Sequence, residues 1–506
     1  MKTENIVIVG GGSSGWMTAA TLLSQFPNKK ITLIESPNIA TVGVGESTLA
    51  GINNWCELVG IKDKDFLSEV DGTIKLSIQF ENFYRKDSGK FHYPFGTPYT
   101  VGNKAELNDW HFKKILYPET PVSDYAECVY PQMALVSQNK LFTNEDKRLP
   151  NYNFLNDAAY QFDATKFGLW LKEKFCLPKG LKHILCEVEK VIQNENGIEY
   201  LILEGGQPIS ADLFIDCTGF TSLLMDKTLL EPFDSYSDIL PNNSAWATKI
   251  PYKNKNEEMV SYTNCTAIDN GWVWSIPLWS RIGSGYVYSD EFVSDDDALI
   301  EFQKHIGYGD ELEYRNIKMR IGLHSRLWVK NVVTIGLSAG FIEPLESNGL
   351  QLTHEALYNL VRVLQRETTN QFDKDQFTAI CKTTFRTMAE FISMHYILSQ
   401  RDDTEYWKHW TNKTIATKFD NMMLYVENVQ RNYHHSSEGG LHCIGTGMHW
   451  WPTDKAALLY NIFDTDFEKE LQHYIKRLTE RRDVWRYKVE DCPTPYQFLK
   501  ENFYNE

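Results

Sequence analysis

The stretch NIVIVGGGSSGWM, residues 5–17, decides the fold of this 506-residue chain. Its first five residues are apolar enough to form a buried strand, and Gly10, Gly12 and Gly15 follow directly in the spacing GxGxxG. Residues 14–26 place apolar side chains at helical spacing, which predicts a helix with one buried face. A strand, a glycine turn and a helix in this order predict a dinucleotide-binding fold, because the glycines let backbone amides approach a pyrophosphate.

A carboxylate follows the second predicted strand, residues 31–34: Glu35 stands twenty residues after Gly15. A carboxylate at this place accepts hydrogen bonds from ribose hydroxyls and favours a free 2′-hydroxyl, so the motif predicts FAD or NAD rather than NADP. The candidate cofactor-binding residues of this region are Gly10, Gly12, Ser13, Ser14, Gly15, Trp16 and Glu35.

Later strands decide between the two cofactors. Residues 186–193 and 198–204 predict a hairpin, and the apolar stretches 212–219 and 332–340 each run into glycine. Strands that return to the nucleotide-binding fold this late suit a two-domain FAD enzyme better than a compact NAD dehydrogenase. FAD is therefore the predicted cofactor.

The composition excludes several classes of protein. A net charge of −16 argues against nucleic acid as a main partner, because phosphates need a basic surface. No apolar run approaches the roughly 18 residues of a membrane helix, and residues 1–12 do not resemble a signal peptide. The nine cysteines form no CxxC pair, and His442, Cys443 and His449 lack ligand spacing. We therefore expect no metal site and reduced thiols in a cytoplasm.

A second unusual stretch is GWVWSIPLW, residues 271–279, which holds three tryptophans in nine residues. It reads as a strand as far as Pro277, which has no N–H to donate to a sheet. Trp272 and Trp274 lie on the same side of such a strand. By pattern alone, the two tryptophans are expected to fill an internal interface.

Four further segments carry a family resemblance: GVGESTL (43–49), KLSIQF (75–80), GWVWSIP (271–277) and GFIEPLESNG (340–349). With the glycine motif, they resemble the flavin-dependent halogenases of the tryptophan halogenase family. The resemblance spans roughly residues 1–410 and also includes AYQFDATKF (159–167), DLFIDCTGF (212–220) and HYILSQRDDTEYW (395–407). Many enzyme types share GxGxxG, whereas WxWxIP together with EPLES is far more specific.

The resemblance implies a chemistry in which FADH2, O2 and a halide (chloride, bromide or iodide) give hypohalous acid. The acid travels through an internal tunnel to a lysine, and an aromatic substrate is then attacked electrophilically. By this resemblance Trp272, Trp274, Ile276 and Pro277 form the tunnel wall that keeps the substrate from the flavin and so prevents direct hydroxylation.

Two residues are implied to react. Lys75, whose strand neighbours Ile74 and Leu76 lie on the opposite face, would by pattern alone point to solvent. The resemblance makes it the catalytic lysine, which either donates a hydrogen bond to hypohalous acid or forms a haloamine; both alternatives stay open. Glu346 matches the general base that accepts the proton of the attacked ring carbon. Glu343, three residues earlier, is its competitor or a structural partner.

The halide is implied to bind the backbone amides near Ser347, Asn348 and Gly349, close to the flavin ring, before a helix predicted at 353–365. Many relatives have threonine where this chain has Asn348, a change that leaves the amides in place and bears on halide preference. Further candidate cofactor-binding residues are Gly45, Glu46, Val188 and Leu337.

The substrate pocket is expected to be aromatic. FHYPFG, residues 91–96, resembles a segment that lines the indole pocket in tryptophan halogenases, with Tyr93 at the place of an imidazole and Phe95 at that of a phenylalanine. Trp450 and Trp451 are expected to add another aromatic face. Because the C-terminal hundred residues do not reproduce the features that clamp a free amino acid, the expected substrate is a small free aromatic, indole-like or phenolic.

The expected architecture is α/β: a Rossmann-like FAD-binding module of the flavoprotein monooxygenase type with an interleaved, helix-rich substrate module. The first is assigned residues 1–90, 150–225 and 310–390, and the second residues 91–149, 226–309 and 391–506. A single dinucleotide motif implies that a separate NADH-dependent flavin reductase supplies FADH2. A homodimer is one of the oligomeric states that the sequence allows.

Two other functions fit parts of the sequence. An FAD-dependent aromatic hydroxylase shares the nucleotide fold but needs neither Lys75 nor the tryptophan wall. An FAD-binding protein that has lost catalysis has no reason to retain both Lys75 and Glu346.

Overall fold

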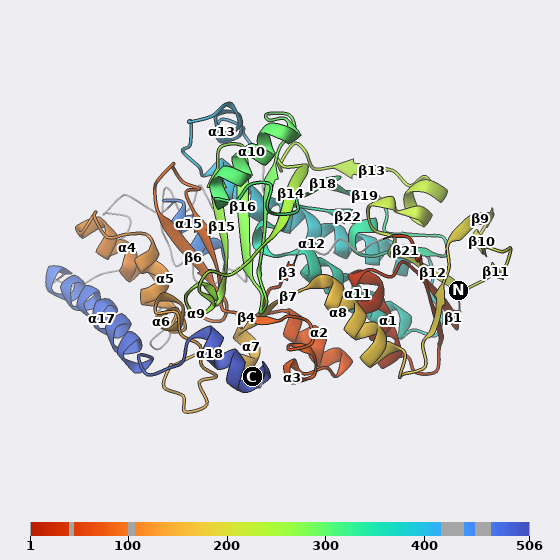
Figure 1. Ribbon diagram of the computed structural model, residues 1–506, viewed down its shortest axis with the longest axis horizontal. Coiled ribbons are helices and arrows are strands. Elements are labelled where there is room, and N and C mark those ends of the chain that lie inside the picture. The colour runs from red at the N-terminus through yellow and green to blue at the C-terminus, as the bar shows by residue number, and fades with distance from the viewer. Residues whose placement is uncertain (1, 40–44, 100–106, 416–439, 451–466, 505–506) are drawn as a thin grey trace. The chain divides into compact units, whose positions relative to one another are not determined.

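The computed structural model describes residues 2–39, 45–99, 107–415, 440–450 and 467–504. The chain divides into two compact units, each built from three segments (Figure 1). The first unit consists of Met1–Gly72, Tyr160–Thr248 and Tyr314–Ala389, and the second of Thr73–Ala159, Lys249–Glu313 and Glu390–Glu506. The boundaries expected near residues 90 and 225 thus lie at 72 and 248.

The first unit is built on a six-stranded sheet with β1 (Asn5–Val9) near its middle. Parallel strands flank β1 on both sides: β2 (Lys30–Glu35) and β12 (Leu213–Asp216). The order is β20-β21-β12-β1-β2-β8, with β8 at Lys182–Leu185, β21 at Val332–Thr334 and the antiparallel edge strand β20 at Trp328–Val329. Apolar strands flanked by helices on a parallel sheet confirm the predicted α/β class.

The turn after β1 requires glycine. Gly10 has a φ of +118°, and a Cβ there would lie 2.1 Å from the carbonyl oxygen of Cys217, at the end of the neighbouring β12. A Cβ on Gly15 would lie 2.0 Å from the Gly10 carbonyl oxygen. The motif therefore lets helix α1 (Ser13–Gln25) start directly against the sheet.

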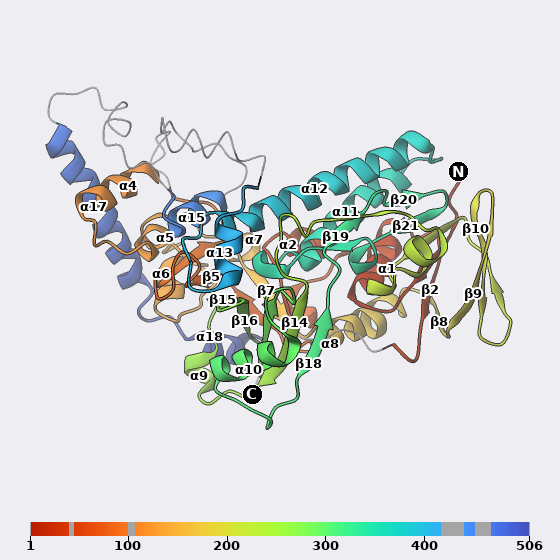
Figure 2. The same ribbon diagram turned by 90° about the horizontal axis from the view of Figure 1, so that it is seen from above.

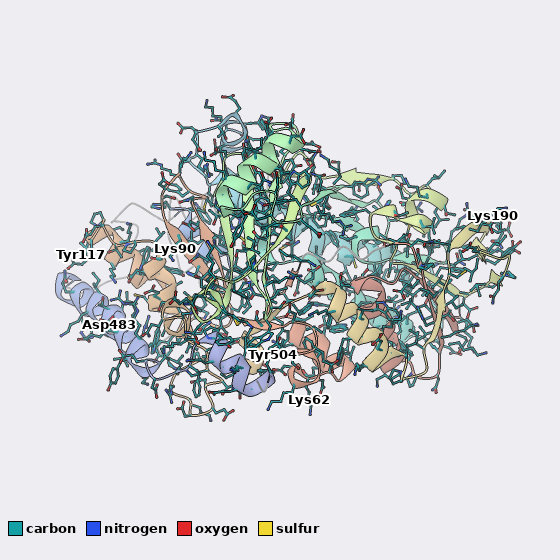
Figure 3. The ribbon with its side chains drawn as sticks, viewed as in Figure 1. Lys62, Lys90, Tyr117, Lys190, Asp483 and Tyr504 are labelled. Carbon is teal, nitrogen blue, oxygen red and sulfur yellow. The ribbon has the colours of Figure 1, made fainter. Side chains whose placement is uncertain are left out.

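Smaller sheets and helices complete the first unit. The predicted hairpin is formed by β9 (Val188–Asn194) and β10 (Gly197–Leu203), with β11 (Pro208–Ile209) at its edge (Figure 2). It packs on the sheet through a core cluster that includes Val7, Leu201 and Phe214. Exposed charged side chains such as Lys190 lie along β9 (Figure 3). Other elements are α2 (Ile52–Val59), α3 (Asp63–Phe66), α8 (Ala164–Trp170), β13 (Phe233–Ser235), β14 (Ser244–Ile250), β18 (Arg315–Lys318), β19 (Gly322–His324), β22 (Gly340–Phe341) and α11 (Gly349–Leu364).

The second unit contains five strands in the order β17-β16-β15-β5-β6. Their bounds are Ile282–Tyr288, Gly271–Pro277, Tyr262–Ile268, Ser77–Glu81 and Lys90–Pro94. The strand β5 pairs in parallel with β15 and in antiparallel with β6. This pairing is why residues 73–90 belong to the second unit rather than to the nucleotide-binding one.

The second unit also contains helices. They are α4 (Leu107–Leu116), α5 (Ser123–Val129), α6 (Met133–Ser137), α7 (Phe154–Asp157), α9 (Lys255–Glu258), α10 (Asp295–Ile306), α13 (Glu405–Thr411), α15 (Gly440–Gly447), α17 (Phe467–Lys488) and α18 (Pro495–Leu499). The long helix α12 covers Gln371–Ile397. Ser294 caps α10 by accepting from the Asp297 N–H, as its position before an acidic run predicts. The third tryptophan of the 271–279 stretch, Trp279, stacks on Tyr504 at 3.8 Å between ring centroids.

Two further observations concern the whole chain. All nine cysteines are free thiols. Among the residues that the structure describes, no helix combines the length and the apolar character that a membrane crossing demands.

Candidate active site

The glycine motif presents open backbone at the carboxyl end of β1. Gly12 is the N-cap of α1, and a Cβ built on it would meet no described atom within 4 Å. The first N–H groups of α1 have no acceptor within the helix. The order of the sheet also reverses here, since β2 and β12 lie on opposite sides of β1. An open helix start at such a reversal fits the pyrophosphate of a dinucleotide.

A second loop lies against the same helix start. Gly336, which follows β21, has a φ of +74°, and a Cβ there would lie 2.6 Å from the Cβ of Ser14. The structure thus brings the candidate Leu337 next to the motif, although more than 300 residues separate them in sequence.

Glu35 ends β2 beside two nitrogen-bearing side chains that the sequence analysis did not single out. Its Oε2 lies 2.8 Å from Lys172 Nζ and 2.9 Å from His183 Nε2. A Cβ on Gly11 would lie 2.4 Å from Glu35 Cγ, so the glycine turn passes directly over this carboxylate. Lys172 and His183 hold the carboxylate beside the motif, where a ribose would lie. The positions of Lys172 and His183 in the sequence did not predict these contacts, because only tertiary packing brings the two residues next to Glu35.

The side chains of two candidate cofactor-binding residues pack into the interior of the first unit. Trp16 is 1% exposed and packs against His183, with ring centroids 5.5 Å apart. Val188 is half-buried opposite Leu203 and packs on the cluster beneath the hairpin. A cofactor contact by Trp16 would therefore use its backbone.

The candidates Glu46, Ser347 and Gly349 lie together. The two-residue strand β3 (Glu46–Ser47) pairs with β7 (Ala159–Phe162). From it, Ser47 Oγ lies 3.2 Å from Ser347 Oγ, and Glu46 Oε2 lies 3.9 Å from where a Cβ of Gly349 would be. Burial raises the pKa of the Glu46 carboxyl to about 7. A carboxyl that is partly protonated near neutrality is a functional-site signature.

The backbone at Ser347–Gly349 suits an anion. Ser347 has a φ of 58°, in the left-handed region, and Asn348 returns to the right-handed one. Successive N–H groups in such an alternation converge on one point. The helix α11 begins at Gly349, four residues before the start predicted from its apolar spacing, because Asn348 already has helical dihedral angles.

Both candidate carboxylates of the EPLES segment are buried. Glu343 is fully buried, and its Oε2 accepts a hydrogen bond from Asn242 Nδ2 at 2.8 Å. Glu346, in a 3₁₀ turn that covers Pro344–Glu346, is 1% exposed. The Asn242 contact gives Glu343 a structural hydrogen-bond partner.

Lys75 is fully buried in the second unit, not exposed as an isolated lysine in a strand would be. It ends β4 (Thr73–Lys75), and the strand is interrupted at Leu76 before β5 begins. Its Nζ lies 5.1 Å from the centroid of the Phe95 ring. In its protonated form, a lysine nitrogen over an aromatic face is stabilised by the ring quadrupole.

The two tryptophans lie on the same face of β16. Trp272 and Trp274 are 1% and 8% exposed, with ring centroids 6.3 Å apart at 59°. Gly285 and Gly283 stand opposite Trp274 and Ile276 on β17. Glycine opposite each leaves room for the large side chains, and Pro277 ends the strand, as predicted.

Two of the aromatic pocket candidates are neighbours in the structure. Tyr93 and Phe95 meet edge to face at 5.9 Å, and Tyr93 also contacts Phe391, which the sequence analysis did not name. Trp450 is 9% exposed and packs over Gly445 of α15. Trp451 lies outside the described residues. The neighbouring His92 is buried and bonded to Ser77 Oγ at 3.1 Å, and burial lowers its pKa to about 3.

No cluster of His, Cys, Asp and Glu side chains that could hold a metal ion occurs in the described part of the chain.

Comparison with known proteins places these features in a family. The family model of tryptophan halogenase matches residues 5–448. The 7-chloro-L-tryptophan 6-halogenase KtzR of Kutzneria sp. (strain 744) is 32% identical over 523 residues, covering 98% of each chain. The solved structure "VirX1 apo structure" aligns with a TM-score of 0.93 at 38% identity over 100% of both chains. The tryptophan 6-halogenase SttH from Streptomyces toxytricini aligns with a TM-score of 0.85 at 29% identity, covering 98% of this chain and 99% of its own.

These matches agree with the sequence resemblance and with the α/β fold, and membership implies the use of flavin and halide. The open glycine turn, the carboxylate at Glu35 and the anion-type backbone at Ser347–Gly349 fit those groups. The chain belongs to the tryptophan halogenase family and is an enzyme of the flavin-dependent halogenase class.

Proposed function

We propose that this enzyme halogenates a small free aromatic compound, indole-like or phenolic, through hypohalous acid that reaches Lys75 by an internal tunnel. The overall steps balance as FADH2 + O2 + X⁻ + H⁺ → FAD + HOX + H2O, followed by ArH + HOX → ArX + H2O. A separate NADH-dependent flavin reductase supplies FADH2. The observation that carries the proposal is the complete burial of Lys75 beside the ring of Phe95.

Residues of the first unit bind the flavin and the halide. The amides at the start of α1 bind the pyrophosphate, and Glu35, oriented by Lys172 and His183, accepts from the ribose. The amides near Asn348 and Gly349 hold the halide at the positive end of α11. Bound FADH2 supplies the electrons that activate O2 to oxidise this halide.

Lys75 orients the oxidant in the second unit. Its ammonium donates a hydrogen bond to the oxygen of hypohalous acid, which makes the halogen more electrophilic. The free amine would instead displace hydroxide and form an N-halogen bond, so that the haloamine delivers the halogen. Either form requires the nitrogen at Nζ, which is why the position admits no apolar replacement.

Glu346 and the tryptophans complete the proposal. The carboxylate of Glu346 accepts the proton that the attacked ring carbon loses. Trp272 and Trp274 form the wall that separates substrate from flavin, since their packed indoles leave little freedom to move. The rings of Tyr93, Phe95 and Trp450 hold the aromatic substrate through stacking and edge contacts.

The test incubates the protein with FAD, NADH, a flavin reductase, bromide and a panel of indoles and phenols, and reads product masses. Wild type and the control variant Lys90→Ala, which removes an exposed lysine of β6, are expected to give the same brominated product. Lys75→Ala is expected to abolish it while NADH consumption continues. Halogenated product from Lys75→Ala at the wild-type rate would contradict the proposed role. Hydroxylated product without halide would instead identify the enzyme as a hydroxylase.

A further inference from the structure

Asn348 has a buried side chain that does not cap the helix it precedes. It is fully buried, and it stands at the N-cap of α11, where asparagine commonly accepts a hydrogen bond from the helix. Here the side chain makes no such bond. Within the described ranges of the chain, neither Nδ2 nor Oδ1 has a hydrogen-bond partner. A buried carboxamide in this state requires an explanation, and a bound ion is one that satisfies its donor.

The other asparagine in α11 gives the contrast. Asn359 is also largely buried, but its Nδ2 donates to the carbonyl oxygen of Glu355 at 2.9 Å. That donor is satisfied by the helix itself. The unused donor at Asn348 is therefore a property of its position at the helix start and not of asparagine in this helix.

The surroundings of Asn348 favour a negative ligand. It follows Ser347 in the left-handed region, so the N–H groups of this turn converge. It also precedes Gly349, where the positive end of the 16-residue helix begins. The carboxamide N–H2 belongs to Asn348, whose own backbone N–H and that of Gly349 form part of the same turn.

Resting on the proposed function, we propose that Asn348 Nδ2 donates a side-chain hydrogen bond to the halide, in addition to the backbone amides, and thereby sets halide preference. The interaction of a donor with an anion falls with their separation, so this bond stabilises chloride more than bromide and bromide more than iodide. Removing it shifts the preference of the site toward the larger halides. Asn348 is thus a specificity residue whose side chain acts on the substrate ion directly.

The experiment measures halide binding by the FAD-loaded enzyme, with no turnover. Isothermal titration with chloride, bromide and iodide, supported by the line width of the bromide NMR signal, is run at pH 6 so that Glu46 is mostly protonated. The variants are Asn348→Ala, which keeps the backbone amides, and Asn348→Asp, which keeps the shape but replaces the donor by a negative charge. Asn359→Ala is the matched control on the same helix.

We expect Asn348→Ala to weaken chloride binding about ten-fold and iodide binding less, as for loss of one hydrogen bond to a charged group. Asn348→Asp is expected to abolish measurable binding, and Asn359→Ala to leave it unchanged. If Asn348→Ala fails to fold, wild-type halide affinity in the aspartate variant would still overturn the inference, because that variant has no donor at this position. Wild-type halide affinity in the variants, or a change confined to FAD affinity, would overturn the inference while the halogenase proposal stands. No halide binding by the wild type would instead refute the proposed halide site.

Discussion

In the proposed function, the glycine turn of the first unit and the Lys75 strand of the second bind their ligands by different means. At the turn, recognition is made by backbone: Gly10 and Gly15 leave no room for a Cβ, and Gly12 is open. At Lys75 recognition is made by one side chain, fully buried beside an aromatic ring. The first therefore depends on the absence of side chains and the second on the presence of one nitrogen.

This difference predicts how each region fails. A substitution in the glycine turn is expected to disturb the fold, because Gly10 and Gly15 also allow α1 to pack closely against the sheet. A substitution at Lys75 is expected to remove the reacting nitrogen and to leave the sheet intact. The variants below test that contrast.

The largest effect is expected at Gly10. Gly10→Ala places a Cβ about 2 Å from a carbonyl oxygen in a strained left-handed conformation, and we expect it to lower the free energy of unfolding by more than about 4 kcal/mol. Gly12→Ala, where the same Cβ meets open space, is expected to fold normally and to bind FAD more weakly. Urea denaturation and FAD fluorescence measure the two effects. Equal stability of the two variants would show that the sheet does not require glycine at position 10 for packing.

The next effect concerns activity. Lys75→Met keeps most of the side-chain volume and removes the amino group, so we expect the protein to fold with a smaller loss of stability than Gly10→Ala. Halogenation is expected to fall by at least about 100-fold, as for loss of a positioned catalytic group. Melting curves and initial rates with bromide check this. A large drop in melting temperature would mean that Lys75 also holds the fold.

The same contrast explains what could be predicted from sequence. The strand, the glycines and the acid at 35 follow from local patterns, and β1 begins and ends as predicted. The contacts of Lys172 and His183 with Glu35, and of Ser47 with Ser347, join segments that are distant in the chain, so no local pattern indicates them.

Lys75 shows the limit most clearly. Its pattern alone predicted a solvent-facing lysine, and only the family resemblance predicted a site residue. Lys75 is buried because the segment around it packs inside the second unit. The alternation of apolar and polar residues along one strand does not show how that strand packs.

A smaller effect is expected at Glu35, where a side chain supports the glycine turn. Glu35→Gln keeps the shape but weakens the bonds to a ribose and to Lys172, so we expect FAD affinity to fall about ten-fold. Lys172→Met, which leaves the carboxylate but removes one partner, is expected to have a weaker effect. Fluorescence titration with FAD measures both. If Lys172→Met were the more harmful, the lysine rather than the carboxylate would contact the cofactor.

The smallest effect is a pH dependence of stability at Glu46. Burial raises the pKa of this carboxyl from 4.5 to about 7, so between these values the unfolded chain loses a proton that the folded protein keeps. The contribution of Glu46 to the free energy of unfolding is therefore fully present below about pH 4.5, falls as the pH rises, and is lost above about pH 7. Glu46→Gln carries no proton to lose, so its advantage over wild type should grow from pH 5 to pH 7.5, to at most about 3 kcal/mol, and then level off. Taking the difference between the two proteins at each pH removes the contributions of the other titrating groups. A difference that is constant across this range would mean that Glu46 is ionised in the folded protein, and an ionised carboxylate beside Gly349 would oppose an anion there.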